Sequence, residues 1–102
     1  MLLKLEGYSV ASASDGRTGL RCALENPPDV ILSDVNMPHM SGYAFLAAVR
    51  SRPMLNATRL VLLTAQVDPA LADQAGGVLP DACLGKPFTR GQLLATLRSV
   101  AP

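Results

Sequence analysis

Two short apolar runs, at residues 30–32 and 59–64, constrain the fold of this chain more than any other feature of its sequence. Val30-Ile31-Leu32 lies between Pro28 and Pro38, and the second run is Arg59-Leu60-Val61-Leu62-Leu63-Thr64. Short, continuous apolar runs of this kind are typical of strands that are buried on both faces, as in parallel sheets. The sequence therefore favours a parallel sheet that includes these two runs.

The rest of the chain alternates strand patterns with helical patterns. Tyr8–Ala13 alternates larger apolar with small residues and predicts a strand, and Ala82-Cys83-Leu84 predicts a last short one. Met1–Glu6 is expected to be the last turns of a helix that Gly7 closes. Four further helices are predicted: 17–25, ended by Asn26-Pro27-Pro28; 41–52, capped by Ser41; 68–75, opened by Asp68-Pro69; and the stretch that Thr89 caps. This order indicates an α/β fold with helices on both faces of the sheet.

Composition limits the classes of protein to which the chain can belong. Its 102 residues, 49% hydrophobic and 17% charged, suit a single domain with a packed core over residues 1–102. A net charge of +1 gives no basic field, so direct nucleic-acid binding is not expected. No apolar run is long enough to span a membrane, and a cytoplasmic protein is expected. Cys22 and Cys83 lack metal-ligand spacing and are predicted to be reduced, buried, small apolar residues.

Three of the predicted strands end at, or just before, a residue able to act on one oxyanion: Asp34, Thr64 and Lys86. The carboxyl ends of parallel strands meet at one edge, where open α/β folds bind ligands. A carboxylate at that edge can attack a phosphoryl group and hold it as an acyl phosphate. Lys86 would then pair with one phosphoryl oxygen and Thr64 would donate a hydrogen bond to another. Taken singly, each residue also has a structural interpretation: Asp34 as a loop carboxylate, Thr64 as a strand residue and Lys86 as part of a turn.

The chain resembles the receiver domain of response regulators along most of its length. Asp34, in Asp34-Val35-Asn36-Met37-Pro38, corresponds to the family's phosphoacceptor, Thr64 to its switch hydroxyl and Lys86 to its phosphate-binding lysine. The separations of 30 residues from Asp34 to Thr64 and 52 from Asp34 to Lys86 agree with the family's layout. At these spacings and in this strand order, the functional interpretation of the three residues outweighs the structural one.

The resemblance also implies the surroundings of the site. Ala65 follows the switch hydroxyl of Thr64, and its small side chain would leave the approach to Asp34 open. Pro87 follows Lys86. The backbone carbonyl of Asn36, together with the Asp34 carboxylate, would face a Mg²⁺ ion. Met40-Ser41-Gly42 matches the family's helix start and supplies a reason for Gly42, which is unexplained by the local pattern.

The family further implies a fold and a set of partners. The fold would be flavodoxin-like, with strand order 2-1-3-4-5. The partners would be a histidine kinase or phosphotransfer protein and a downstream protein target. Activity would be at most self-phosphorylation from phosphohistidine or a small phosphodonor, followed by autodephosphorylation.

Two departures from the family pattern alter these expectations. The family's opening strand, with the acidic pair that holds Mg²⁺, and most of the first helix have no counterpart here, so four parallel strands and weak Mg²⁺ binding are expected. The missing strand would lie between 8–13 and 30–33, and either these strands pair directly or their edges pair with another copy. Association into a homo-oligomer is favoured, because the Asp34 strand would lose a neighbour. Cys83 stands where the family usually carries an aromatic residue.

Three functional hypotheses remain open from the sequence. The first is a phosphoacceptor that signals to a protein partner by a conformational change. The second is a pseudo-receiver that acts as an interaction module without phosphorylation. The third is that these residues are an N-terminally truncated form of an ordinary response regulator.

Overall fold

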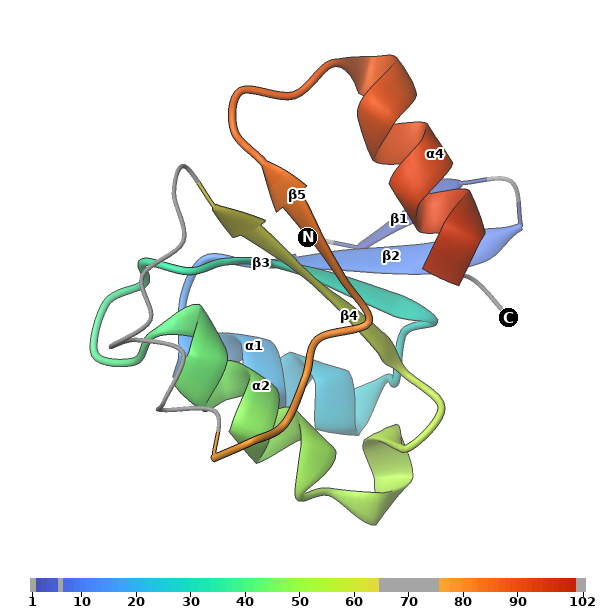
Figure 1. The fold of residues 1–102 in the computed structure, drawn as a ribbon. Coiled ribbons are helices and arrows are strands. Elements are labelled where there is room, and N and C mark those ends of the chain that lie inside the picture. The colour runs from blue at the N-terminus through green and yellow to red at the C-terminus, as the bar shows by residue number, and fades with distance from the viewer. Residues whose placement is uncertain (1, 6, 65–75, 101–102) are drawn as a thin grey trace.

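The computed structural model describes residues 2–5, 7–64 and 76–100, which form a five-stranded sheet with helices on both faces (Figure 1). The elements in chain order are β1 (Leu2–Leu5), β2 (Tyr8–Ala13), α1 (Gly16–Glu25), β3 (Val30–Asp34), α2 (Gly42–Arg50), the 3₁₀ helix η1 (Pro53–Leu55), β4 (Arg59–Thr64), β5 (Ala82–Gly85) and α4 (Arg90–Val100).

The strands follow one another across the sheet in the order β1-β2-β3-β4-β5. The four from β2 to β5 are parallel, and β1 runs antiparallel to β2. Figure 1 shows α1 and α2 on one side of the sheet and α4 on the other. The flavodoxin-like α/β fold and the four parallel strands predicted from the sequence are confirmed.

The two apolar runs form the central strands β3 and β4. Val30, Ile31, Leu60, Val61 and Leu62 are at most 2% exposed. Because side chains alternate along a strand, Ile31, Leu60 and Leu62 reach the core cluster shared with α1 and α2, whereas Val30 and Val61 reach the one shared with α4. Burial on both faces explains why these runs carry no polar alternation.

Strand β2 pairs directly with β3, in a register that runs from Val10 opposite Val30 to Ala13 opposite Ser33. Asp29, just before β3, fixes this pairing at its amino end. Its carboxylate accepts hydrogen bonds from the Ser9 backbone N–H at 2.8 Å and the Ser9 hydroxyl at 3.3 Å. The Asp29 N–H donates in turn to the Ser9 carbonyl at 2.9 Å. Strands β2 and β3, which were expected to flank the missing strand, thus pair directly with each other.

The expectation that β3 would lack a neighbour is therefore wrong, because β2 and β4 occupy its two edges. The argument for association at that position no longer holds. Homo-oligomer formation through the outer strands β1 and β5 stays a prediction.

The predicted helix at residues 1–6 is also wrong, because Leu2–Leu5 forms the strand β1. Leu5 pairs with Tyr8 at the end of this antiparallel pair of strands. Gly7 directly precedes Tyr8, and its φ of 87° is the left-handed conformation that tight hairpin turns require. A leucine-rich segment followed by glycine is compatible with a helix end or a hairpin. The hairpin forms because it gives the outer edge of β2 a partner, and that edge would otherwise be unpaired.

Capping residues mark two helix starts as predicted. The Ser41 hydroxyl accepts a hydrogen bond from the Ala44 N–H at 3.1 Å, at the start of α2. At the start of α4, the Thr89 hydroxyl accepts from the Gln92 N–H at 3.1 Å, and the Gln92 side chain accepts from the Thr89 N–H at 2.8 Å. This reciprocal pair is a capping box. The predicted helix at 68–75 lies outside the described residues.

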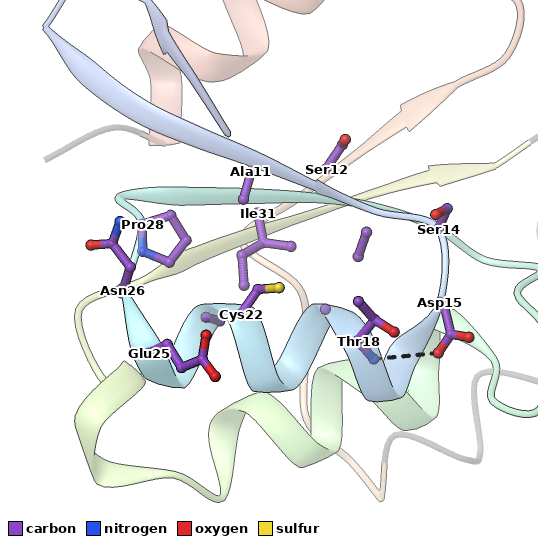
Figure 2. A pocket seen from close by; sticks show the side chains of 13 residues that line it. Ala11, Ser12, Ser14, Asp15, Thr18, Cys22, Glu25, Asn26, Pro28 and Ile31 are labelled. Carbon is purple, nitrogen blue, oxygen red and sulfur yellow. Dashed lines mark hydrogen bonds between the residues drawn. The ribbon is translucent and has the colours of Figure 1, made fainter. Parts of the chain in front are cut away.

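The two cysteines are free, as predicted, but they are exposed and not buried. Cys22 lies on α1 beside a cavity of about 350 Å³ between α1 and β2, and Figure 2 shows it among Ala11, Thr18 and Ile31. Many of the lining residues are small, so the space is left unfilled. Cys83 belongs to β5, an outer strand of the sheet. No helix in the described part of the chain is long and apolar enough to cross a membrane.

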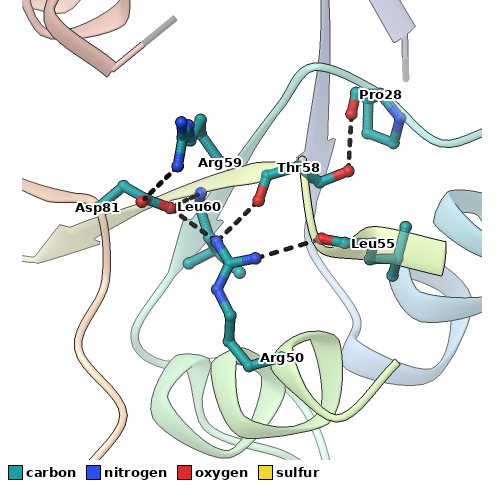
Figure 3. Close-up of polar contacts among 7 residues, drawn as sticks. All are labelled: Pro28, Arg50, Leu55, Thr58, Arg59, Leu60 and Asp81. Atoms are coloured by element: carbon teal, nitrogen blue, oxygen red, sulfur yellow. Dashed lines mark hydrogen bonds and ion pairs between the residues drawn. The ribbon is translucent and has the colours of Figure 1, made fainter. Parts of the chain in front are cut away.

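A polar network joins the amino ends of the strands (Figure 3). The Asp81 carboxylate accepts from the Leu60 N–H and from the Arg50 guanidinium, both at 2.7 Å. Arg50 also donates to the carbonyls of Leu55 and Thr58, at 3.2 and 2.7 Å. This network fixes the strand edge opposite the predicted site.

Replacement of Asp29 by Ala tests the closure of β2 on β3. The change removes the acceptor of two hydrogen bonds from Ser9, and we expect the free energy of unfolding to fall by about 1–3 kcal/mol. Urea denaturation measures it. The control Glu25→Ala, at an exposed carboxylate, is expected to change it by less than about 0.5 kcal/mol. Equal effects of the two substitutions would contradict the role given to Asp29.

Candidate functional site

The three predicted site residues lie at the carboxyl edge of neighbouring strands. Asp34 is the last residue of β3, Thr64 is the last of β4, and Lys86 follows β5 directly. Asp34 pairs with Leu63 and Thr64 with Gly85 in the parallel register. The edge is the one at which open α/β sheets bind ligands.

Asp34 and Lys86 form an ion pair across the end of β4. The Lys86 ammonium Nζ donates a short hydrogen bond to Oδ1 of Asp34, and each side chain is 41% exposed. A half-exposed pair of this kind adds at most about 1 kcal/mol to stability. Its main consequence is chemical: a fixed cation faces an accessible carboxylate.

Thr64 lies on the strand between these two residues. Its carbonyl accepts a hydrogen bond from the Lys86 backbone N–H at 2.8 Å. This bond holds the start of the loop that follows β5 against the end of β4. Pro87 is exposed and follows Lys86 through a cis peptide bond. Ala65 lies outside the described residues.

The loop that follows Asp34 is held by backbone contacts. The Val35 N–H donates to the Leu63 carbonyl at 3.1 Å, and the Gly42 N–H donates to the Val35 carbonyl at 2.6 Å. A Cβ atom at Gly42 would lie 2.4 Å from the Asp34 carbonyl oxygen. Only glycine allows this approach, which gives Gly42 a physical reason. His39, in the same loop, is exposed and has a φ of 65°, a conformation in which His is enriched.

The described residues do not fit a resident Mg²⁺ site. Asp34 supplies one carboxylate, and one of its oxygens is already bonded to Lys86. Asn36 is exposed in the following loop. Among the described residues, no group of three or more His, Cys, Asp or Glu side chains is placed to hold a metal. Mg²⁺ requires octahedral oxygen ligation and gives up water reluctantly, so a single carboxylate and a backbone carbonyl form a weak site.

Sequence reasoning missed Ser33, which directly precedes Asp34. It is fully buried, and its hydroxyl donates to the Asp34 carbonyl at 3.0 Å and lies 3.6 Å from the Met37 sulfur. The available signal was a single hydroxyl residue within an otherwise apolar run.

The chain belongs to the response regulator receiver domain family, because residues 1–98 match that family. The parallel strands covered on both faces, with Asp34 and Lys86 at their carboxyl edge, agree with this family. The sequence prediction of the family is confirmed.

Two relatives illustrate the range of the family. The chain is 37% identical to a probable chemotaxis protein CheY of Rhizobium etli, over 97% of this chain and 77% of that protein. It is 38% identical to the transcriptional regulatory protein PrrA of Mycobacterium tuberculosis, over 96% of this chain but 41% of PrrA. The chain thus spans less than half of that regulator.

Solved structures show the same fold. The chemotaxis response regulator CheY4 of Vibrio cholerae superposes with a TM-score of 0.77 at 40% identity, over 92% of this chain and 78% of CheY4. The receiver domain of the sensor histidine kinase PA1611 from Pseudomonas aeruginosa superposes with a TM-score of 0.73 at 25% identity, over 86% and 73% of the two chains. That structure has a magnesium ion coordinated in its active site cleft.

A matched pair of glycine substitutions tests the tight approach at the site. Gly42→Ala is expected to lower the free energy of unfolding by about 1–3 kcal/mol, because its Cβ overlaps the Asp34 carbonyl. Gly91→Ala, in α4 with its nearest contact at 3.8 Å, is expected to raise it by about 0.5–1 kcal/mol. Urea denaturation measures both. A stabilising Gly42→Ala would show that the approach is looser than described.

The reactivity of Cys83 provides a pH-dependent test. Partial burial raises the pKa of the Cys83 thiol above its ordinary value. The thiolate is the nucleophile, so a raised pKa leaves less of it at a given pH. In a Cys22→Ser background, alkylation by iodoacetamide at pH 8 should be slower in the folded protein than in urea, with the half-maximal rate at a higher pH. A folded midpoint at or below the unfolded one would contradict the partial desolvation of this thiol.

Proposed function

We propose that residues 1–102 act as one receiver unit in which Asp34 accepts a phosphoryl group. The observation that carries the proposal is the ion pair between Lys86 and the Asp34 carboxylate at the carboxyl edge of the sheet. The cation lies where an oxygen of a phosphoryl group on Asp34 would need its charge balanced. The site is half-exposed, so a donor protein has access to it.

The bonds that form and break are those of the Asp34 carboxylate and the phosphoryl donor. A carboxylate oxygen of Asp34 attacks the phosphorus of a phosphohistidine or of a small acyl phosphate, and the bond from phosphorus to the leaving group breaks. The product is an aspartyl phosphate, which water later hydrolyses to return the carboxylate. Lys86 moves from the carboxylate to a phosphoryl oxygen and neutralises charge.

Thr64 is the proposed switch. Its hydroxyl donates to a phosphoryl oxygen on phosphorylated Asp34 and draws the end of β4 toward the site. The Lys86 N–H donates a hydrogen bond to the Thr64 carbonyl, so the loop that follows β5 is coupled to that movement. Ala65 follows Thr64 in the sequence, and its small side chain is expected to leave the approach to Asp34 open; Pro87 continues the loop that carries Lys86.

The proposed partners are a histidine kinase or phosphotransfer protein and a downstream protein target. A net charge of +1 gives no basis for direct contact with nucleic acid. The cytoplasmic location inferred from the sequence stays a prediction. Any Mg²⁺ held by Asp34 and the Asn36 carbonyl is expected to bind with a dissociation constant of about 1 mM or weaker.

A second candidate function is an interaction module that takes no phosphoryl group. The observation in its favour is the donor set, because the described residues gather no carboxylate cluster around Asp34. The two functions differ in one measurable property, the formation of an aspartyl phosphate.

Mass spectrometry after incubation with acetyl phosphate, with and without Mg²⁺, separates them. We expect a low yield of one added phosphoryl group, and we expect Asp34→Asn to abolish it because the nucleophile is lost. Lys86→Met, which removes the balancing cation, should lower the rate about 100-fold. Asp15→Asn is the matched control, because Asn caps α1 as well as Asp does.

Two outcomes would overturn the assignment. An adduct that persists in Asp34→Asn would place the acceptor elsewhere. A folded wild-type chain with no adduct under either condition would favour the interaction module.

A further inference from the structure

Ser33 is a buried hydroxyl in a strand that is otherwise apolar. It is 0% exposed, and among the described residues only Thr58 is a second buried polar side chain. A buried hydroxyl without a hydrogen-bond partner costs about 1–3 kcal/mol. The cost of burying Ser33 directly before Asp34 therefore depends on what its hydroxyl contacts.

Its contacts join the end of β3 to the loop that follows. The Ser33 Oγ donates to the Asp34 carbonyl at 3.0 Å and lies 3.6 Å from the Met37 sulfur, a weak acceptor. The carbonyl is part of the acceptor residue itself. The hydroxyl thus acts on the backbone that carries the Asp34 carboxylate.

Gly42 lies beside the same carbonyl. A Cβ atom on Gly42 would lie 2.4 Å from the Asp34 carbonyl oxygen, so the start of α2 already touches that peptide group. The next residue, Val35, is bonded to both neighbours: its N–H donates to Leu63 and its carbonyl accepts from Gly42. We call Ser33, the Asp34 carbonyl and Gly42 the carbonyl clamp.

We propose that Ser33 is a positioning residue whose hydroxyl, through the carbonyl clamp, aims the Asp34 carboxylate at Lys86 and at the incoming phosphoryl group. This inference rests on the proposed function of Asp34. The backbone orientation sets the direction of the Cα–Cβ bond of Asp34, so a peptide group that accepts a hydrogen bond from Ser33 and lies beside Gly42 limits the positions open to the carboxylate. Misplacement of a reacting group by about 1 Å costs up to about 100-fold in rate.

The first test is the kinetics of phosphorylation by acetyl phosphate. Ser33→Ala is expected to lower the rate at saturating donor about 10-fold or more, with the donor concentration at half-saturation unchanged, because the donor is bound as before but attacked from a worse position. A rate equal to that of the wild type would overturn the proposal.

Thr58→Val is the matched control. Thr58 is 3% exposed, and its hydroxyl donates to the Pro28 carbonyl at 2.8 Å at the opposite edge of the sheet (Figure 3). The substitution removes the same kind of buried bond and is expected to lower stability to a similar degree, but to leave the phosphorylation rate unchanged. An equal loss of rate in the two variants would mean that Ser33 acts only through general stability.

The second test does not depend on phosphorylation. The ¹³Cγ resonance of Asp34 is measured with and without Lys86→Met, in the wild-type, Ser33→Ala and Thr58→Val backgrounds. We expect the change caused by Lys86→Met to shrink by at least half in Ser33→Ala and to persist in Thr58→Val. A full response in Ser33→Ala overturns the proposal, even if the wild type takes no phosphoryl group and the proposed function itself has failed.

Thermal unfolding by circular dichroism checks that each variant is folded. If Ser33→Ala does not fold, both readouts are taken on Ser33→Cys, which replaces the hydroxyl with the weak S–H donor of a thiol. It is expected to lower the rate about threefold to tenfold, and wild-type values in both readouts overturn the proposal.

Discussion

Direct pairing of β2 with β3 is the constraint on which the rest of this structure depends. It places β3, with Asp34 at its end, between two neighbours and completes the backbone hydrogen bonding of a strand that is apolar on both faces. Asp29 provides the polar part of this contact, through four hydrogen bonds with Ser9 that are 2.8 to 3.3 Å long. Strand β1 then covers the outer edge of β2, so that edge is not left open.

The site follows from the order of the strands beyond this pairing. Strands β3 and β5 are separated only by β4, a distance of about 10 Å, which a lysine side chain helps to span. The Asp34–Lys86 pair is half-exposed and contributes little to stability, whereas the fully buried residues of β3 and β4 provide the apolar burial. The residues that would carry the chemistry are thus different from those that stabilise the fold. The acceptor strand can carry a reactive carboxylate because its stability comes from its buried apolar residues and not from the Asp34–Lys86 pair.

The sequence predicted those elements that depend on local pattern. Val30–Asp34 and Arg59–Thr64 were identified because continuous apolar runs have few other solutions, and the order of the strands placed the three site residues at one edge. Leu2–Leu5 was assigned wrongly, as part of a helix over residues 1–6, because six residues before a glycine fit a helix end as well as a hairpin. The roles of Asp29 and Ser33 were missed for a different reason. Both act through backbone groups of other residues, and no periodicity reports such contacts before the fold is known.

The closure of β2 on β3 can be measured directly in solution. Nuclear Overhauser contacts between backbone protons of the two strands, recorded on the isotopically labelled chain, provide this measurement. The structure predicts contacts that follow the register Val10–Val30 to Ala13–Ser33, in a parallel pattern. Their absence, together with contacts from β3 to a strand other than β2 and β4, would show that another segment lies between them, at a separation of about 10 Å, and would contradict the account.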